Sequence, residues 1–187
     1  MLKRSFLPAL VVFLVSQLGA AATDHEPPIV NLHAPRGQSQ QGALGNHRWW
    51  QPPNEGSNQC PVTEVADAPF AVGWPPVHVR PGARMLVRFQ KETQPQSVEI
   101  HGPRGVIRAT LQQHSSGGTV SAWDARFTAP STLRRHNMVL DGKRRRFYVI
   151  EVLASWGEAD CTWDDGPGGP APSQRAEWVL SVKKRSR

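Results

Sequence analysis

Thr23-Asp24-His25 would form the N-terminus of the chain if a leader were removed after Ala22. A free amine with histidine at the third position can bind Cu(II) or Ni(II) in a square plane, through the amine, two deprotonated amides and the imidazole. His25 is therefore a candidate metal ligand. A shift of the cleavage site by one residue would abolish this site, so metal binding stays an alternative to the main interpretation given below.

A second candidate site is an acidic stretch near the C-terminal end of the chain. Glu158, Asp160, Asp164 and Asp165 lie next to a run of Gly and Pro. Calcium takes oxygen ligands from flexible loops, but the spacing here does not match that of an EF-hand, and we expect a solvated loop. A rigid, proline-rich loop over residues 164–173 could instead insert into a secreted enzyme, so an enzyme inhibitor is a second alternative function.

The third candidate is a set of basic residues on both sides of Asp141-Gly142, namely Arg134, Arg135, Lys143, Arg144, Arg145 and Arg146. Asp-Gly between two apolar runs predicts a tight hairpin, because both turn residues must take positive φ. The hairpin would gather these cations on one edge, either as a surface for an anionic polymer or as charges that keep an edge strand from pairing with other chains. The protective role needs no partner and is the simpler interpretation. No aromatic residues are interleaved with the runs, so sequence-specific nucleic-acid binding is not expected.

Cys60 and Cys161 are the two cysteines of the chain. In an exported protein an even number of cysteines favours a disulfide. Closing a loop of about 100 residues would contribute about 4 to 5 kcal/mol in the chain-entropy model. Two free thiols or an intermolecular bridge are open alternatives. A zinc site is disfavoured because structural zinc needs four ligands.

Catalytic motifs are missing from the sequence. It contains no Gly-x-Ser-x-Gly elbow, no His-Glu-x-x-His and no phosphate-binding glycine loop. The seven histidines are scattered singly: His78 and His101 fall on predicted solvent faces, and His114 and His136 fall in predicted loops. We therefore expect a protein that is not an enzyme and needs no cofactor.

Residues 1–22 have the features of a secretory signal peptide. Lys3 and Arg4 precede an apolar run, and small residues follow it as a cleavage site. The apolar run is shorter than the roughly 20 residues that span a bilayer, so we expect cleavage, export and no transmembrane segment in the remaining chain. The net charge of +7, from 22 Lys and Arg against 15 Asp and Glu, is compatible with an anionic partner but identifies none.

Residues 23–73 are rich in Pro, Gly and Gln, and no apolar period persists there for more than a few residues. Such a composition buries too little apolar surface to offset the entropy of ordering. We expect an extended, partly disordered N-terminal arm. Within it, the Trp49-Trp50 pair either packs back on the folded domain, which we favour, or forms an exposed recognition patch.

Residues 74–187 show the alternation that is typical of β-strands. In the clearest strand one face carries Tyr148, Ile150, Val152, Ala154 and Trp156. The other face is also mostly apolar, which predicts a central strand. A second hairpin is expected around the turn at residues 102–105, and a short helical turn is possible at residues 133–137.

These patterns predict an all-β fold with about seven or eight short strands and turn signals roughly every 8 to 12 residues. We expect an antiparallel β-sandwich of immunoglobulin-like or fibronectin-like type over residues 74–187, with a small barrel as the alternative. The functional interpretation is a secreted, non-catalytic binding or interaction module at or outside the cell envelope. Its partner would be another protein or an anionic envelope polymer.

Overall fold

The computed structural model describes residues 26–50, 62–69, 71–102, 105–130, 132, 134–140, 142–157 and 174–184. These residues form a sandwich-like, all-β structure of two sheets, and within them the helical content is a single 3-10 turn, Pro35–Gly37. None of the described segments provides a helix of the length and apolarity needed to cross a membrane.

The two sheets are built from strands that lie far apart in the sequence. The first sheet has the order β2 (Gln38–Gln41), β1 (Ile29–Ala34), β6 (Arg84–Gln90), β10 (Thr119–Thr128) and β9 (Thr110–Ser116). The second has the order β4 (Val62–Val65), β3 (Ala43–Trp50), β13 (Gln174–Lys184), β12 (Lys143–Trp156), β7 (Ser97–Gly102) and β8 (Gly105–Ile107). In addition, β11 (Arg134–Leu140) pairs with β12, and β5 (Val77–Val79) pairs with the end of β13. All described pairs are antiparallel except β5 with β13.

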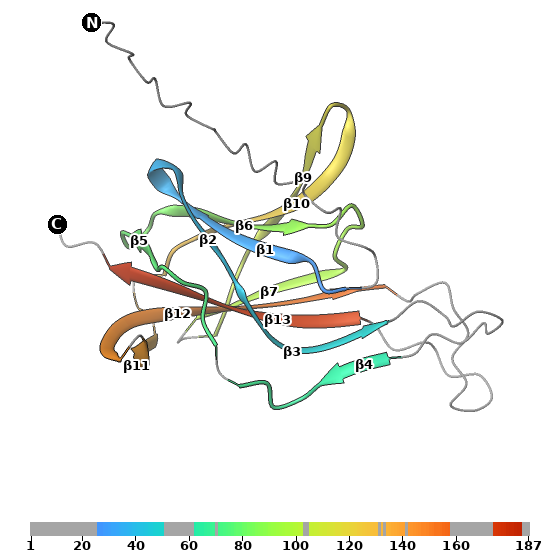
Figure 1. Cartoon of the computed structure of the whole chain (residues 1–187). Coiled ribbons are helices and arrows are strands. Elements are labelled where there is room, and N and C mark those ends of the chain that lie inside the picture. Colours follow the sequence, from blue (N-terminus) through green and yellow to red (C-terminus); the bar gives the residue numbers. More distant parts are fainter. Residues whose placement is uncertain are drawn as a thin grey trace, which may run out of the picture.

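The core lies between the sheets, where β1 and β6 face β12 and β13 (Figure 1). The predicted central strand is confirmed: β12 pairs with β13 on one side and with β7 on the other. Its inward face is also as predicted, because Ile150, Val152, Ala154 and Trp156 are buried in the main core and Tyr148 packs against it.

Large aromatic side chains fill the centre of the core. The ring of Trp156 lies 5.3 Å from that of Trp49, 5.8 Å from that of Phe89 and 6.2 Å from that of Trp178, each pair in an edge-to-face arrangement. Phe89 also meets Trp178 at 5.7 Å. Such pairs contribute beyond the apolar area that they bury. Trp49 is fully buried, as we expected of this residue.

The expectation of an extended arm is wrong for residues 26–50. Val30, Leu32 and Ala34 of β1 point into the core at period two, and β1 is hydrogen-bonded between β2 and β6. The chain then crosses between the sheets at Gly42, where a Cβ would lie 2.9 Å from Leu180 Cδ2. The apolar pattern of β1 is short. The strand is ordered because it pairs with β6, and local composition cannot reveal a pairing with a distant segment.

Two further local predictions are decided by the sheet pairing. The turn at residues 102–105 does join a hairpin, formed by β7 and β8. The helical turn expected at residues 133–137 is wrong, because β11 begins at Arg134 and pairs with β12 along its length. Tertiary pairing here outweighs local helix preference.

A buried polar junction ties the sheets together. Gln40 of the first sheet and Ser181 of the second are 3 % and 0 % exposed. Gln40 Nε2 donates to Ser181 Oγ at 2.9 Å, and the Ser181 N–H donates back to Gln40 Oε1 at 2.9 Å. Ser181 Oγ donates to the Gly73 carbonyl. The Gly73 N–H in turn donates to the Val179 carbonyl at 3.0 Å. Gln40 Nε2 also donates to the Pro75 carbonyl, so the chain before β5 is hydrogen-bonded to both sheets.

Candidate functional site

The predicted basic hairpin is formed by β11 and β12. Its register runs from Leu140 opposite Lys143 to Arg134 opposite Val149. Arg144 lies opposite Val139, and Arg146 opposite Asn137. Because successive side chains alternate between faces, Arg135, Arg144 and Arg146 lie on one face of the ribbon, and all three are exposed.

The arginines on this face are not neutralised by acids of the described residues. None of Arg135, Arg144 and Arg146 forms an ion pair there. Between them Val139 is 64 % exposed, and at the base of the same face Lys184 Nζ lies 5.1 Å from the centroid of the Tyr148 ring. The face thus presents cations around one exposed apolar side chain. Lys143 and Arg145 alternate onto the opposite face, and the side chain of Arg134 is outside the described atoms.

The base of the hairpin is anchored by aromatic packing. Phe147 is buried, stacks on His136 at 6.3 Å and meets the edge of Trp74 at 6.2 Å. Val72 packs against the same small cluster. Beyond this base the hairpin stands clear of the described β13 strand, because β12 pairs with β13 only from Tyr148 onward. The cationic face therefore projects from a rigid support.

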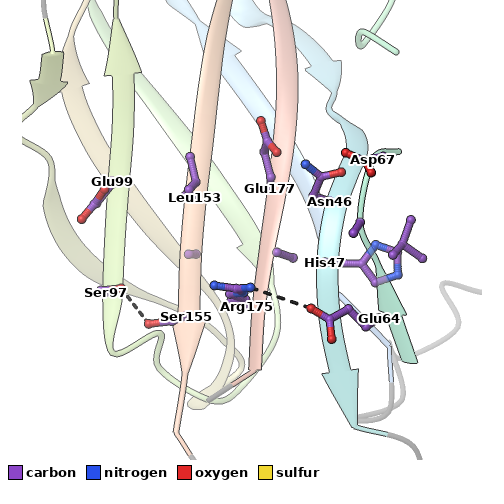
Figure 2. Close-up of a pocket in the computed structure, with 14 residues that line it drawn as sticks. Asn46, His47, Glu64, Asp67, Ser97, Glu99, Leu153, Ser155, Arg175 and Glu177 are labelled. Atoms are coloured by element: carbon purple, nitrogen blue, oxygen red, sulfur yellow. Dashed lines mark hydrogen bonds and ion pairs between the residues drawn. The ribbon is translucent and has the colours of Figure 1, made fainter. Parts of the chain in front are cut away.

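A groove of about 450 Å³ lies on the outer face of the second sheet (Figure 2). It runs across β4, β3, β13, β12 and β7. Nine of the fourteen described residues that line it have polar or charged side chains, and Leu153 is the largest of the apolar ones. Leu153 is 37 % exposed and lies between Glu99 and Glu177 in the strand register.

Glu177 is the half-buried carboxylate of this groove. A bulge sets Gly45 and Asn46 of β3 opposite it, and a Cβ at Gly45 would lie 3.6 Å from Glu177 Oε2. Burial raises the pKa of Glu177, and the charge of Glu151 raises it further. His101 and a hydrogen bond from the Asn46 backbone act in the opposite direction on this pKa. Ionised Glu177 is therefore a negative charge that the fold only partly compensates.

Glu177→Gln is expected to stabilise the protein at neutral pH. The pKa of Glu177 is raised in the folded state, so its stabilising contribution is complete below the ordinary carboxyl pKa and is lost as the pH rises through the folded value. The glutamine variant should melt higher than the wild type at about pH 7.5 and equal to it at about pH 4, near the ordinary glutamate pKa. Thermal unfolding followed by circular dichroism measures both. An equal difference at both pH values would show that ionisation is not the cause.

The other charges of the groove are paired to different degrees. Glu99 Oε2 lies 2.8 Å from His101 Nε2. Glu64 is 3.2 Å from an Arg48 nitrogen and 3.9 Å from one of Arg175. Glu64 is thus paired with two cations, whereas Asp67 after β4 and Glu177 beside Leu153 form no ion pair with a described residue.

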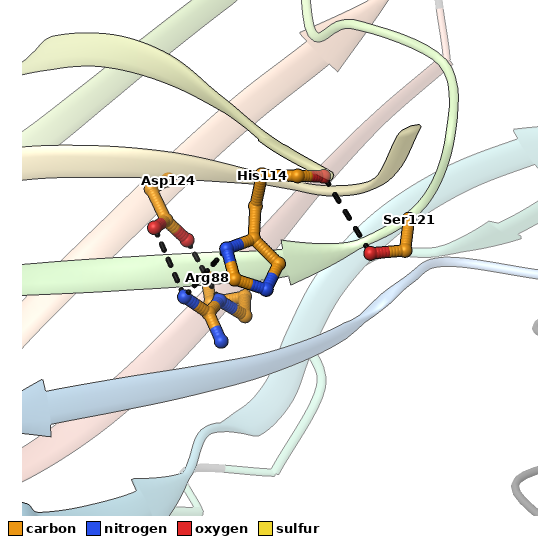
Figure 3. Close-up of polar contacts among 4 residues, drawn as sticks. All are labelled: Arg88, His114, Ser121 and Asp124. Carbon is orange, nitrogen blue, oxygen red and sulfur yellow. Dashed lines mark hydrogen bonds and ion pairs between the residues drawn. The ribbon is translucent and has the colours of Figure 1, made fainter. Parts of the chain in front are cut away.

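A polar cluster on the outer face of the first sheet joins Arg88, Asp124 and His114 (Figure 3). Arg88 donates to both carboxylate oxygens of Asp124, at 2.7 and 3.0 Å, and to His114 Nδ1 at 3.2 Å. Burial lowers the pKa of the neighbouring His33, and the charge of Arg88 lowers it further. The guanidinium thus bonds both Asp124 oxygens and His114 Nδ1, and the three side chains form one hydrogen-bonded cluster.

Comparisons of the chain with protein-family models, curated proteins and solved structures find no match. The functional assignment therefore depends on the site geometry alone.

The remaining sequence candidates fall outside the described residues. They are His25, the acidic stretch at residues 158–165, the loop at residues 164–173, and the cysteines Cys60 and Cys161. Metal binding, enzyme inhibition and the disulfide accordingly stay predictions. Within the part of the chain that the structure describes, no three His, Cys, Asp or Glu side chains gather in a way that could hold a metal ion.

Sequence reasoning identified the basic hairpin but missed the groove and the polar cluster. His114 was expected in a loop and lies in β9; His136 was also expected in a loop and lies in β11. Glu151 and Leu153 on the outer face of the central strand were the available signal for the groove. Their neighbours Glu99 and Glu177 come from strands that only the sheet order brings alongside.

Proposed function

We propose that this protein is a non-catalytic binding module that works at or outside the cell envelope and docks on an anionic envelope polymer through the β11–β12 hairpin. The observation that carries the proposal is the exposed face with Arg135, Arg144 and Arg146 and no ion-pair partner among the described residues. Guanidinium groups form paired, charge-assisted hydrogen bonds with phosphate and carboxylate groups.

The spacing of these cations supports a ligand-binding role over a purely protective one. Arg144 and Arg146 are two residues apart on one strand, so their attachment points are about 7 Å apart. Like charges on one face repel and cost stability, and a polyanion would remove this cost. The aromatic base formed by Phe147, His136 and Trp74 holds the ribbon in place, so little ordering entropy is lost on binding.

Export and the finer fold type belong to the same proposal. The sequence of residues 1–22 supports a signal peptide, and the pair Cys60 and Cys161 supports a disulfide in an oxidising compartment. Antiparallel strands in two packed sheets support an immunoglobulin-like or fibronectin-like sandwich.

The triple variant Arg135→Gln, Arg144→Gln, Arg146→Gln is expected to bind heparin, used as a polyanion probe, at least about tenfold more weakly than the wild type. Each cation in contact with a phosphate-like group adds close to one unit to the slope of log affinity against log salt. Elution from heparin-agarose with a NaCl gradient, and titration at several salt concentrations, would measure the loss and the smaller slope.

The matched control removes three other exposed arginines, Arg80, Arg84 and Arg126, and so lowers the net charge equally. It should elute close to the wild type. If both triple variants lose affinity to the same extent, binding follows net charge and the hairpin is not the docking site.

A further inference from the structure

The groove on the second sheet has a charge opposite to that of the whole chain. The protein carries a net charge of +7, yet Glu64, Asp67, Glu99 and Glu177 line this one groove against the single cation Arg175 and the imidazole of His47. Figure 2 shows these side chains spread over the outer face of the sheet. In a basic protein such a local reversal of sign attracts cationic ligands and repels the anionic partner proposed above.

Two carboxylates that line the groove, Glu177 beside Leu153 and Asp67 after β4, form no ion pair with a described residue. Glu64 is matched by Arg48 and Arg175, but Glu177 forms no ion pair with any described residue, and the partner of Glu99 is the side chain of His101. Leu153 lies between Glu99 and Glu177 and offers an exposed apolar contact. A Lys or Arg side chain has the matching chemistry, because its aliphatic stem packs on apolar surface while its charged end stays near water and carboxylates.

The length of the groove favours a peptide over a small amine. It crosses five neighbouring strands, β4, β3, β13, β12 and β7. At about 4.8 Å between strands this is about 19 Å, the length of about six extended residues at about 3.3 Å each. A single small cation would occupy only a fraction of that length.

We propose that this groove binds an extended, lysine- or arginine-bearing segment of a partner protein, with a basic side chain packed on Leu153 between Glu99 and Glu177. The site is separate from the β11–β12 hairpin and takes a ligand of the opposite charge. The two sites would let the protein join a cationic protein segment to an anionic surface.

Fluorescence anisotropy with the labelled hexapeptide Ala-Lys-Ala-Lys-Ala-Lys tests the proposal. The purified protein should bind it, should bind the matching peptide with Gln in place of Lys far more weakly, and should lose affinity as salt is added. The double variant Glu99→Gln, Glu177→Gln should weaken binding about tenfold or more, as expected when charge-assisted contacts are removed from a partly desolvated site. Leu153→Lys should weaken it as well, by placing a cation in the groove.

The matched control is Glu92→Gln, an exposed acid away from the groove, which should leave binding unchanged. Melting curves of all variants separate lost binding from lost folding, and Glu177→Gln is itself expected to stabilise. Equal binding of the Lys and Gln peptides, or an equal loss in Glu92→Gln, would overturn the proposal.

Two other occupants of the groove would also be detected. If spermidine displaces the peptide at equal concentration, the site takes small amines and the peptide proposal is wrong. If the purified protein dimerises in analytical ultracentrifugation and the hairpin triple variant does not, the occupant is the basic hairpin of a second copy. The spermidine result would leave the heparin experiment unchanged, whereas a hairpin-dependent dimer would also cover the proposed heparin surface. The double variant Glu99→Gln, Glu177→Gln leaves the hairpin intact and should keep heparin binding, so it separates failure of one proposal from failure of the other.

Discussion

Trp156→Ala is expected to lower the free energy of unfolding by about 3 to 5 kcal/mol, the range for a fully buried tryptophan. Trp156 is 1 % exposed and touches Trp49, Phe89 and Trp178 edge-on. Its removal leaves a cavity between the two sheets that three rigid rings cannot close. Urea unfolding followed by far-ultraviolet circular dichroism measures the loss.

Trp74→Ala is the matched control for this prediction. Trp74 is 38 % exposed, and among the described residues its ring contacts that of Phe147 alone, at 6.2 Å. Because less apolar surface is removed from water, we expect a loss of about 1 to 2 kcal/mol. An equal loss in both variants would contradict a core centred on Trp156. Trp74→Ala should in addition loosen the base of the basic hairpin and weaken heparin binding.

Gly73→Ala is expected to destabilise the protein by about 3 kcal/mol or more, since it disturbs several buried hydrogen bonds at about 1 to 3 kcal/mol each. A Cβ at Gly73 would lie 2.2 Å from the Gln41 carbonyl oxygen and 2.9 Å from Gln40 Oε1. The backbone must therefore move, which breaks the contacts of Gly73 with Val179 and Ser181. The same movement shifts Val72 and Trp74 away from Phe147, so the hairpin should also bind heparin less well.

Gly45→Ala provides the comparison for this substitution. The added Cβ would meet its nearest atoms at 3.6 Å, which is ordinary contact. Gly45 is half-buried, and because the added methyl group makes no clash we expect a change in stability of less than about 1 kcal/mol. Thermal and urea unfolding should therefore separate the two variants clearly. If Gly73→Ala were as stable as Gly45→Ala, the buried junction of Gln40, Ser181 and Gly73 would not hold the sheets together.

The basic hairpin is a feature that local sequence was sufficient to predict. Positive φ at a turn and period-two alternation are properties of neighbouring residues, so Asp141-Gly142 and the apolar positions of residues 148–156 predicted the β11–β12 hairpin and the inward face of β12. The pairing and the burial confirm both.

The groove is a feature that local sequence could not predict. Glu99, Leu153 and Glu177 lie on β7, β12 and β13, and only the order of these strands in the sheet makes them neighbours. The raised pKa of Glu177 likewise depends on Glu151 across the strand pair and on burial beside β3. No spacing within one segment carries this information.

The sequence by itself therefore determined the β class, the central strand and the hairpin, because alternation and turn geometry act over a few residues. The tertiary structure decided that residues 29–50 form strands of both sheets, and it joined Gln40 to Ser181 across 141 positions of the chain. Sheet order is set by pairing and burial between distant segments, whose free energy is gained only when the whole sandwich assembles.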